Sequence, residues 1–580
     1  MIQLQHPQGR THASLEGPWH VVVDPYETGS KDIFGNPNAR GYHLGETPAT
    51  RWSAEYDFEG SPTLHVPGDW NSQREDLLWY EGTLWYYRRL PPLPPGERLF
   101  LHFGGANYVA EAWLNGTRLG EHRGGFTPFC YEVTDLVSGD GDFVVVRVEN
   151  ARERDRIPTL DSDWWNYGGL TREILLVGTP AAFVRDWFVR LHPDADRVLC
   201  DVEVDGAEAG TPVTLELGGI TAEATTDAAG RVRLETALPG ALWSPADPVL
   251  HDLVIRCGDD EVRDRIGLRH LERRGDEILL NGEPIHLCGI SVHEEALHEA
   301  RRAHSEADAR TLFAAVRELG CNFARLAHYP HNVHMARVAD ELGVLLWEEI
   351  PVYWAIDWEN PDTLEDARGQ LRELILRDRN RASVALWSVA NETPVGDARN
   401  AFLTQLVDDA RSLDPTRLLT AALFMRPGKE EENGRTLRTY TLDDPLAEVL
   451  DVVGCNQYLG WYYTKVEDMA DARWASDVER PLVMSEFGAG ARLGRRGGDD
   501  ERWTEDYQAA VYRAQFDMQG RIPFLRGTSP WILKDFRTPK RPLPGIQDYF
   551  NRKGLVDEAG RKKLVWQVVH DHYARLQAKG

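Results

Sequence analysis

Residues 383–392 have the sequence "SVALWSVANE", an apolar run that ends in an amide and a carboxylate. A charge at the end of a core strand is costly unless water or a partner stabilises it. In an α/β barrel the C-terminal ends of the strands surround the mouth, where functional residues gather. The stretch therefore predicts a barrel strand with Glu392 at the mouth, and it raises the question of which second group works with Glu392.

Apolar runs of the same kind alternate with helical patterns on both sides of this stretch. The eight runs are "PIHLCGIS" (284–291), "CNFARLAH" (321–328), "VLLWEEIP" (344–351), "SVALWSVANE" (383–392), "LLTAALF" (418–424), "VVGCNQY" (452–458), "PLVMSEFG" (481–488) and "LRGTSPWIL" (525–533). Helices are expected at 305–319, 332–342, 364–379, 397–413 and 560–577. Eight strands with helices between them over about 300 residues indicate a C-terminal (β/α)8 TIM barrel. Residues 427–449 and 489–503 are rich in glycine and charge, and we expect them to form long loops.

The N-terminal half of the chain has a different pattern. Residues 1–180 alternate apolar and polar side chains in short runs such as "GTLWYYRRL" and "GDFVVVRVEN", separated by Gly, Pro and Asn turns. This period of two predicts an antiparallel jelly-roll sandwich. Residues 181–272 hold roughly seven further candidate strands, a length and number typical of an immunoglobulin-like β-sandwich. The sequence thus predicts three domains, 1–180, 181–272 and 273–580.

Composition excludes several classes of protein. The chain has 580 residues and a formal net charge of −27, with no basic stripe for nucleic acid or an anionic membrane. No run approaches the roughly 18 apolar residues of a membrane helix. The first residues lack the basic and apolar regions of a signal peptide, so we expect a cytoplasmic protein. Six cysteines without a CxxC pair predict free, reduced thiols.

The second carboxyl is found in "PLVMSEFG", where Glu486 ends the seventh apolar run. Strands four and seven stand on opposite sides of a barrel, so Glu392 and Glu486 can both point inward across its mouth. Glycoside hydrolysis needs two carboxyls that face each other across the scissile bond. Asn391, next to one of them, is suited to bonding the sugar 2-OH, a contact that strengthens in the transition state.

These motifs resemble those of a known family. "WSVANE" and "MSEFG" are similar to the acid/base and nucleophile motifs of glycoside hydrolase family 2. "HVPGDW", "YEGTLWYYRR" and "EAWLNGTRLGEHRGGFTPF" resemble its N-terminal sugar-binding jelly roll, and "FARLAHYPH" resembles its Arg-x-x-His-Tyr-Pro segment. The resemblance covers nearly the whole chain. It implies that Glu392 is the general acid/base, that Glu486 is the nucleophile, that His328 contacts the sugar and that the mechanism is retaining.

The segment "YFNRKGL" (549–555) bears on the choice of sugar. Asn551 and Lys553 resemble the pair with which β-glucuronidases hold the C6 carboxylate of the substrate. A lysine ammonium gives a carboxylate a charge-assisted bond worth about 1.5–3 kcal/mol, which a neutral C6 hydroxymethyl cannot match. The expected activity is exo-hydrolysis of terminal β-D-glucuronic acid from glucuronides. A β-galacturonidase, a β-galactosidase and a non-catalytic carbohydrate-binding protein remain as alternatives.

The same resemblance assigns further contacts to the sugar. It implies that Tyr458 lies beside the nucleophile and Tyr462 near the sugar, that Asp163 binds a sugar hydroxyl, and that Trp531 stacks under the ring. Lys534 departs from the family pattern. It is expected either to add a second cation near the carboxylate or to face solvent.

We expect no metal and no cofactor. "HEEALHEARRAH" contains His293, His298 and His304, but this is neither HExxH nor a helical i, i+4 spacing. No glycine-rich dinucleotide or phosphate loop occurs. The expected partner is a small-molecule or oligosaccharide uronide, and neither nucleic acid nor a membrane is expected to bind. We expect a homo-oligomer whose size the sequence does not give.

Overall fold

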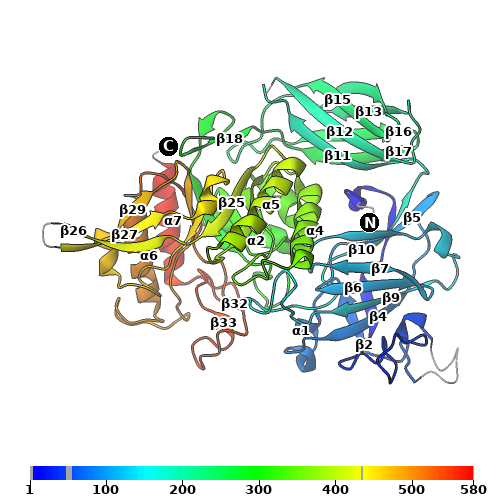
Figure 1. Ribbon diagram of the computed structural model, residues 1–580, viewed down its shortest axis with the longest axis horizontal. Helices are drawn as coiled ribbons and strands as arrows, with labels where there is room; N and C mark the ends of the chain where they lie inside the picture. The colour runs from blue at the N-terminus through cyan, green and yellow to red at the C-terminus, as the bar shows by residue number, and fades with distance from the viewer. Residues whose placement is uncertain (1–3, 47–54, 195, 433–434, 579–580) are drawn as a thin grey trace. The chain divides into compact units, whose positions relative to one another are not determined.

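A computed structural model describes residues 4–46, 55–194, 196–432 and 435–578 of the chain (Figure 1). The chain forms two compact units. Unit 1 comprises Met1–Glu153, Asn166–Ala241 and Leu250–Ile266, and unit 2 comprises Arg154–Trp165, Leu242–Val249 and Gly267–Gly580. The finer division into three domains, 1–180, 181–272 and 273–580, stays a prediction.

Unit 2 is built around a closed parallel barrel whose eight strands follow one another in chain order. The strands are β21 (Leu287–Val292), β22 (Phe323–Leu326), β23 (Leu345–Glu349), β24 (Val384–Asn391), β25 (Leu418–Leu423), β28 (Val453–Asn456), β30 (Leu482–Glu486) and β31 (Leu525–Thr528). All eight coincide with the predicted apolar runs. The TIM barrel predicted for this part of the chain is therefore confirmed.

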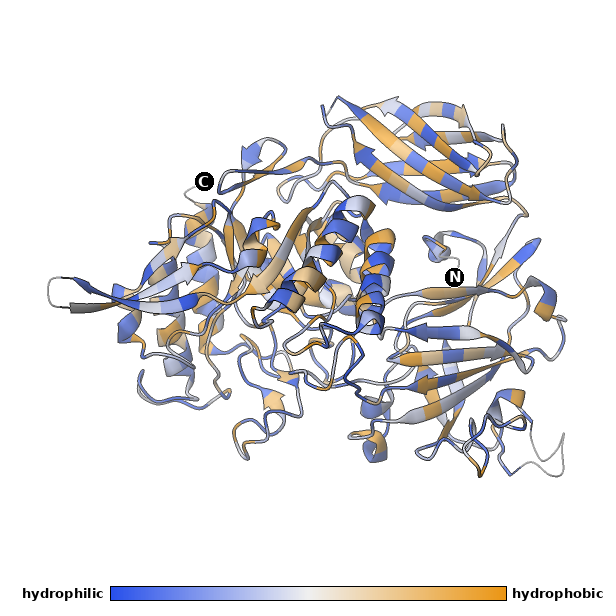
Figure 2. Ribbon diagram, viewed as in Figure 1, coloured by the Kyte–Doolittle hydropathy of each residue, from blue (hydrophilic) through white to orange (hydrophobic). Residues whose placement is uncertain are grey.

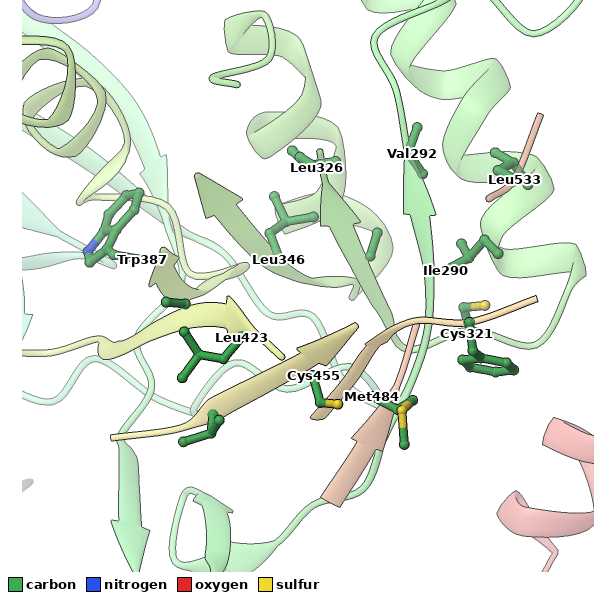
Figure 3. Close-up of a cluster of buried hydrophobic side chains, with 14 of the residues drawn as sticks. Ile290, Val292, Cys321, Leu326, Leu346, Trp387, Leu423, Cys455, Met484 and Leu533 are labelled. Atoms are coloured by element: carbon green, nitrogen blue, oxygen red, sulfur yellow. The ribbon is translucent and has the colours of Figure 1, made fainter. Parts of the chain in front are cut away.

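An apolar core lies outside the barrel wall, and the polar side chains of the mouth, such as Arg325, point inside it. Because successive side chains of a strand point to opposite faces, Arg325 points into the barrel while Leu326 points toward the helices. The main core cluster contains outward strand residues such as Leu346 and Met484, which Figure 3 shows, and helix residues such as Leu403. The helices are α2 (Glu306–Glu318), α3 (Val333–Leu342), α4 (Pro361–Asp378), α5 (Asp397–Leu413), α6 (Glu505–Gln519) and α7 (Leu564–Gln577).

The two segments that were predicted to be long loops differ in secondary structure. Residues 427–449 were predicted to be a loop, and this is wrong. They contain most of an exposed hairpin, β26 (Arg426–Glu432) and β27 (Arg435–Leu442), which pairs with β29 (Arg473–Ser476). Figure 2 shows how hydrophilic β26 is. Residues 489–503 do form a loop, held by a bridge between Ala491 and Trp503.

Short strands complete unit 2. They are β18 (Leu271–Arg274), β19 (Glu277–Leu280), β20 (Glu283–Pro284), β32 (Phe536–Arg537) and β33 (Phe550–Asn551). The last two pair antiparallel, Phe536 opposite Asn551, and thereby close the loop after β31 on itself.

Unit 1 contains two all-β segments, as the period-two patterns predict. The first packs two sheets over a shared core, to which Leu84 and Val146 contribute from one sheet and Leu101 and Leu176 from the other. The first sheet has the order β3 (Thr63–Val66), β2 (Gly17–Val23), β4 (Thr83–Arg89), β9 (Phe143–Glu149), β6 (Val109–Leu114) and β7 (Thr117–Arg123). The second has the order β1 (His12–Ser14), β10 (Ile174–Thr179), β5 (Arg98–Phe103) and β8 (Phe129–Glu132), and the short helix α1 spans Trp70–Gln73.

The second all-β segment also has two antiparallel sheets. One contains β11 (Phe183–Leu191), β12 (Arg197–Asp205) and β15 (Arg231–Ala237). The other has the order β14 (Ile220–Thr225), β13 (Pro212–Leu217), β16 (His251–Cys257) and β17 (Asp260–Ile266). Buried and exposed residues alternate strictly along β15, and the strands of this segment show the alternation in Figure 2.

Two predictions from composition can be compared with the structure. All six cysteines are buried free thiols, as predicted. Among the described residues, none of the helices has the length and apolarity that crossing a membrane requires.

Candidate active site

Two glutamates lie where barrel strands end. Glu486 is the last residue of β30, and Glu392 directly follows β24. Glu392 has a left-handed φ of 52°, which is uncommon for a residue other than glycine and frequent at functional sites. Its backbone N–H donates to the carbonyl of Ala422 at 2.9 Å. The charge of Glu392 contributes to a raised pKa at Glu486, so the two carboxyls belong to one site.

Glu486 is held by two donors. Arg325 Nη1 donates to its Oε1 at 2.8 Å, and the Tyr458 hydroxyl donates to its Oε2 at 2.6 Å. Burial raises the pKa of Glu486 to about 8, and Glu392 adds to the rise, whereas Arg325 and Tyr458 oppose it. Arg325 and Tyr458 therefore fix the carboxyl in one orientation and favour the ionised form that a nucleophile needs.

Arg325 is the buried cation that organises this part of the site. Its Nη2 donates to Glu349 Oε1 at 3.0 Å and to Asn391 Oδ1 at 2.7 Å. Glu349 also pairs with His328 Nδ1 at 2.8 Å. Burial alone would raise the pKa of Glu349, but Arg325 and His328 lower it to about 2. One arginine therefore ties Glu486, Glu349 and Asn391 together.

Glu486 should make the protein less stable as the pH rises. Its folded-state pKa of about 8 lies above the ordinary 4.5, so its stabilising contribution is complete below pH 4.5 and is lost as the pH rises through 8. Glutamine does not titrate. The melting temperature of Glu486→Gln minus that of the wild type should therefore increase between pH 4.5 and about 8, as measured by thermal unfolding.

Asp308→Asn is the matched control, because Asp308 belongs to the capping box of α2 and does not contact Glu486 or Arg325. Burial alone would raise the pKa of Asp308, but the hydrogen bonds from Arg301 and His304 lower it to about 2. The stability that this carboxylate contributes is already complete above pH 4.5, so this variant should be destabilised by a constant amount across the same range. A melting-temperature difference for Glu486→Gln that does not vary with pH would contradict the raised pKa.

Glu392 is more open to solvent than Glu486 and accepts two hydrogen bonds. Trp354 Nε1 donates to its Oε2 at 2.8 Å, and Asn456 Nδ2 donates to its Oε1 at 3.0 Å. Ser485 donates to the amide oxygen of Asn456 at 2.7 Å, which fixes that amide's orientation. Trp354 itself is placed by its backbone N–H, which donates to the carbonyl of Asn391.

Asn391 has an unused donor. Its Oδ1 accepts from Arg325 at 2.7 Å and from Asn456 at 3.0 Å. A guanidinium can only donate, so the amide orientation is determined. The buried Nδ2 has no hydrogen-bond partner among the described residues. Such a group in a native structure calls for a ligand, and a sugar hydroxyl would satisfy it.

Lys553 lies at the other end of the site. Its Nζ donates to the Tyr462 hydroxyl at 2.7 Å and lies 5.2 Å from the centre of the Tyr458 ring. The residue is only 4% exposed, yet in the described part of the chain no ion pair joins it to a carboxylate. Because Tyr458 touches both Glu486 and Lys553, one side chain spans the distance from the nucleophile to the ammonium.

Asn551 and Asp163 support this end of the site. Asn551 Oδ1 accepts from the backbone of Lys553 at 3.2 Å, and its Nδ2 donates to Asp163 at 3.2 Å. Asp163 also accepts from Thr538 at 2.9 Å and from Arg541 Nη2 at 2.5 Å. Three of the roughly four acceptor sites of a carboxylate are thus occupied. The predicted hydrogen bond from a sugar hydroxyl to Asp163 can therefore use only the one remaining acceptor site of this carboxylate.

Arg541 is a second cation beside Lys553. Burial alone would raise the pKa of Tyr462, but the charges of Lys553 and Arg541 outweigh it and lower that pKa. Both cations therefore lie close to the Tyr462 hydroxyl. With Asp163 as the counter-charge of Arg541, this end of the site keeps a net positive charge in a protein whose formal net charge is −27.

Trp531 lies against the histidine of the site. Its ring stacks on His328 with centroids 4.7 Å apart and planes 22° apart, and it meets Phe536 edge-on. His328 Nε2 is 3.7 Å from Glu486 Oε1. Burial lowers the pKa of His328 to about 4, so this ring is neutral at neutral pH. The stacking of a sugar on Trp531 stays a prediction.

Comparison with known proteins now adds to this geometry. The family model described as "Glycosyl hydrolases family 2, TIM barrel domain" matches residues 271–538, and the model described as "Glycosyl hydrolases family 2, sugar binding domain" matches residues 80–180. The chain belongs to glycosyl hydrolase family 2. It is therefore a glycoside hydrolase, and the family resemblance and fold class predicted from its motifs are confirmed.

Similar proteins span nearly the whole chain. A β-glucuronidase of Paenibacillus borealis is 25% identical, over 97% of this chain and 96% of its own length. A β-glucuronidase from Ruminococcus gnavus in complex with D-glucaro-d-lactam has a TM-score of 0.81 at 23% identity, with 98% of each chain covered. A β-galacturonidase from Eisenbergiella tayi bound to galacturonate has a TM-score of 0.79 at 23% identity and the same coverage. At these identities the two structures show a shared fold.

Lys534 has neither of the roles predicted from its departure from the family 2 pattern. It is buried, and its Nζ donates to the carbonyls of Ala296 at 2.5 Å and Glu299 at 2.6 Å. Glu295 lies 3.8 Å away. These acceptors satisfy the ammonium, so Lys534 holds the segment after β21 rather than a substrate or solvent.

Sequence reasoning gave no role to five groups that this family 2 site uses: Arg325, Glu349, Trp354, Asn456 and Arg541. Arg325, Glu349 and Asn456 lie in predicted strands, and the position of Glu349 two residues beyond Trp347 on an inward-facing register could have indicated a role. Trp354 and Arg541 lie in loops without periodicity. Only their neighbourhood in the fold reveals them.

Proposed function

We propose that this chain is a retaining exo-β-glucuronidase, which removes terminal β-D-glucuronic acid from glucuronides. The general acid/base is Glu392 and the nucleophile is Glu486. The family supports glycoside hydrolysis, and the β-glucuronidase relative that spans 97% of the chain supports this sugar.

The observation that carries the uronide assignment is the unpaired ammonium of Lys553. A buried lysine without a carboxylate nearby is costly, and such a cost persists where a ligand supplies the anion. Asn551 lies next to Lys553, and Arg541 lies close by. The C6 carboxylate of a uronic acid bound with C1 above Glu486 fits this end of the site.

The proposed mechanism has two displacements. Glu486 attacks C1 as the C1–O bond breaks, and Glu392 gives its proton to the departing oxygen, so that an alcohol leaves and a glycosyl ester forms. Glu392, now a carboxylate, takes a proton from water. The water oxygen bonds to C1 and displaces Glu486, which releases the uronic acid with its original configuration. Asn391 Nδ2 donates to the 2-OH throughout.

A panel of 4-nitrophenyl β-glycosides tests the substrate class. The glucuronide, galacturonide, galactoside and mannoside share one leaving group, so differences in kcat/KM report the sugar alone. We expect the glucuronide to exceed both neutral hexosides by about 10²-fold or more, since they leave the Lys553 charge unpaired.

The panel separates the alternatives. A galacturonide that is cleaved faster than the glucuronide would keep the uronide site and change only the preferred C4 configuration. A galactoside cleaved faster than either uronide would refute the role given to Lys553. Absence of cleavage of every glycoside would refute the enzyme's assignment to this substrate class.

A further inference from the structure

Exposed apolar side chains gather on one part of the barrel rim. They follow three strands that are neighbours in the barrel, β24, β25 and β28. These side chains are Val395 (62% exposed), Phe424 (43%), Tyr462 (46%) and Tyr463 (65%). Exposed large apolar groups in a cluster commonly mark a binding surface, whereas isolated ones need no explanation.

This apolar rim lies beside Glu392. The backbone N–H of Glu392 donates to the carbonyl of Ala422 at 2.9 Å, and Phe424 follows two residues later. Burial raises the pKa of Tyr463, and the charge of Glu392 adds to that rise. The carboxyl of Glu392 is therefore close to Tyr463 as well. Phe424 and Tyr463 follow two neighbouring strands of the barrel, β25 and β28.

The identity of the occupant follows from the chemistry of Glu392. This residue gives its proton to the oxygen of the departing group, so that group must lie on the Glu392 side of the sugar. Lys553 and Arg541 lie close to the Tyr462 hydroxyl and mark the end of the site proposed for C6. Resting on the function proposed above, we propose that Phe424 and Tyr463 form a subsite for the leaving group, and that it takes planar aromatic aglycones in preference to alkyl or sugar aglycones.

The exposure of the Tyr463 ring supports this preference for aromatic aglycones. Among the described residues, the ring contact made by Tyr463 is with Tyr462, at 6.2 Å between centroids and 66° between planes. An edge contact of this kind covers at most one face of Tyr463, whose side chain is largely exposed. Aromatic rings in contact gain about 0.5–1.5 kcal/mol beyond the burial of their area, which is roughly 3- to 10-fold in binding. A small alkyl aglycone has no aromatic ring, so it obtains little of this additional binding free energy.

The test compares two aglycones of matched acidity. A phenyl glycoside and a fluorinated-alkyl glycoside with leaving groups of similar pKa differ in shape but not in the intrinsic ease of departure. We expect Phe424→Ala and Tyr463→Ala each to lower kcat/KM for the phenyl substrate about 3- to 10-fold. The alkyl substrate should lose less than about twofold, because it does not use the rings.

Tyr463→Phe is the matched control, because it keeps the ring and should retain the wild-type ratio between the two substrates. Both substrates carry the sugar that the wild type cleaves fastest in the glycoside panel. A failure of the uronide assignment would therefore leave this comparison intact. Equal losses on both aglycones, or a wild type that does not prefer the phenyl substrate, would overturn the proposed subsite.

Discussion

Replacement of Glu486 by alanine is expected to lower kcat/KM for an aryl glucuronide by at least about 10⁴-fold, because the covalent route then has no nucleophile. Tyr458 and Arg325 would face an empty space rather than the carboxylate that they hold at 2.6 and 2.8 Å. The rate is measured with a 4-nitrophenyl substrate. Circular dichroism checks that the variant is folded, as it should be when a buried carboxyl with a raised pKa is removed.

Azide distinguishes the roles of the two glutamates. In Glu486→Ala, azide can occupy the vacated space and attack C1 directly, which gives a glycosyl azide of inverted configuration. In Glu392→Ala, azide instead attacks the glycosyl ester on Glu486, which gives a glycosyl azide of retained configuration. The products are identified by NMR with substrates whose leaving groups need no acid. An exchange of the two configurations would reverse the assigned roles.

Replacement of Lys553 by alanine is expected to lower kcat/KM for the glucuronide by about 10²-fold or more. The substrate carboxylate would then be desolvated without its cation, and breaking a buried pair costs about 3–5 kcal/mol. Activity on the matching neutral hexoside should change little, since a hydroxymethyl does not use the ammonium. Both substrates are measured on the same preparation.

Lys562→Ala provides a matched control for Lys553→Ala. Lys562 is a nearby lysine in the sequence, is exposed, and pairs with Glu318 on the barrel surface. An exposed pair of this kind contributes little, so both substrates should keep their wild-type rates. Equal losses on the uronide and the hexoside in Lys553→Ala would mean that Lys553 supports the fold rather than the substrate.

The barrel could be predicted because its strands are short apolar runs that end in polar residues. The hairpin of β26 and β27 could not, since nearly every residue of β26 is exposed and the apolar alternation of a strand is absent. Helix α6 was also missed. It buries Gln508 and Gln515 alongside Tyr512 and Phe516, so its buried face is not an apolar stripe.

The residues of the site likewise fall into a group that could be predicted from the sequence and a group that could not. Glu392, Glu486 and Lys553 lie in local motifs, whereas Arg541 lies ten residues before Asn551 in a loop. The pairing of β32 with β33, Arg537 opposite Phe550, brings that loop back toward the mouth. Trp354 likewise reaches Glu392 because a bridge joins Tyr353 to Asn391. Contacts made by tertiary pairing leave no periodic signal in the sequence.

The proposed function depends on the formation of a covalent ester on Glu486, and mass spectrometry can detect this ester directly. In a 2-deoxy-2-fluoro-glucuronosyl fluoride, the fluorine at C2 removes the 2-OH bond to Asn391 and disfavours positive charge at C1, which slows both displacements. The good fluoride leaving group at C1 speeds only the first displacement, so the ester accumulates. After incubation, proteolysis and mass spectrometry should find one added sugar mass on the peptide that contains "PLVMSEFG", located at Glu486. A labelled Glu392, or fluoride release without any labelled peptide and with an inverted product, would contradict the retaining mechanism.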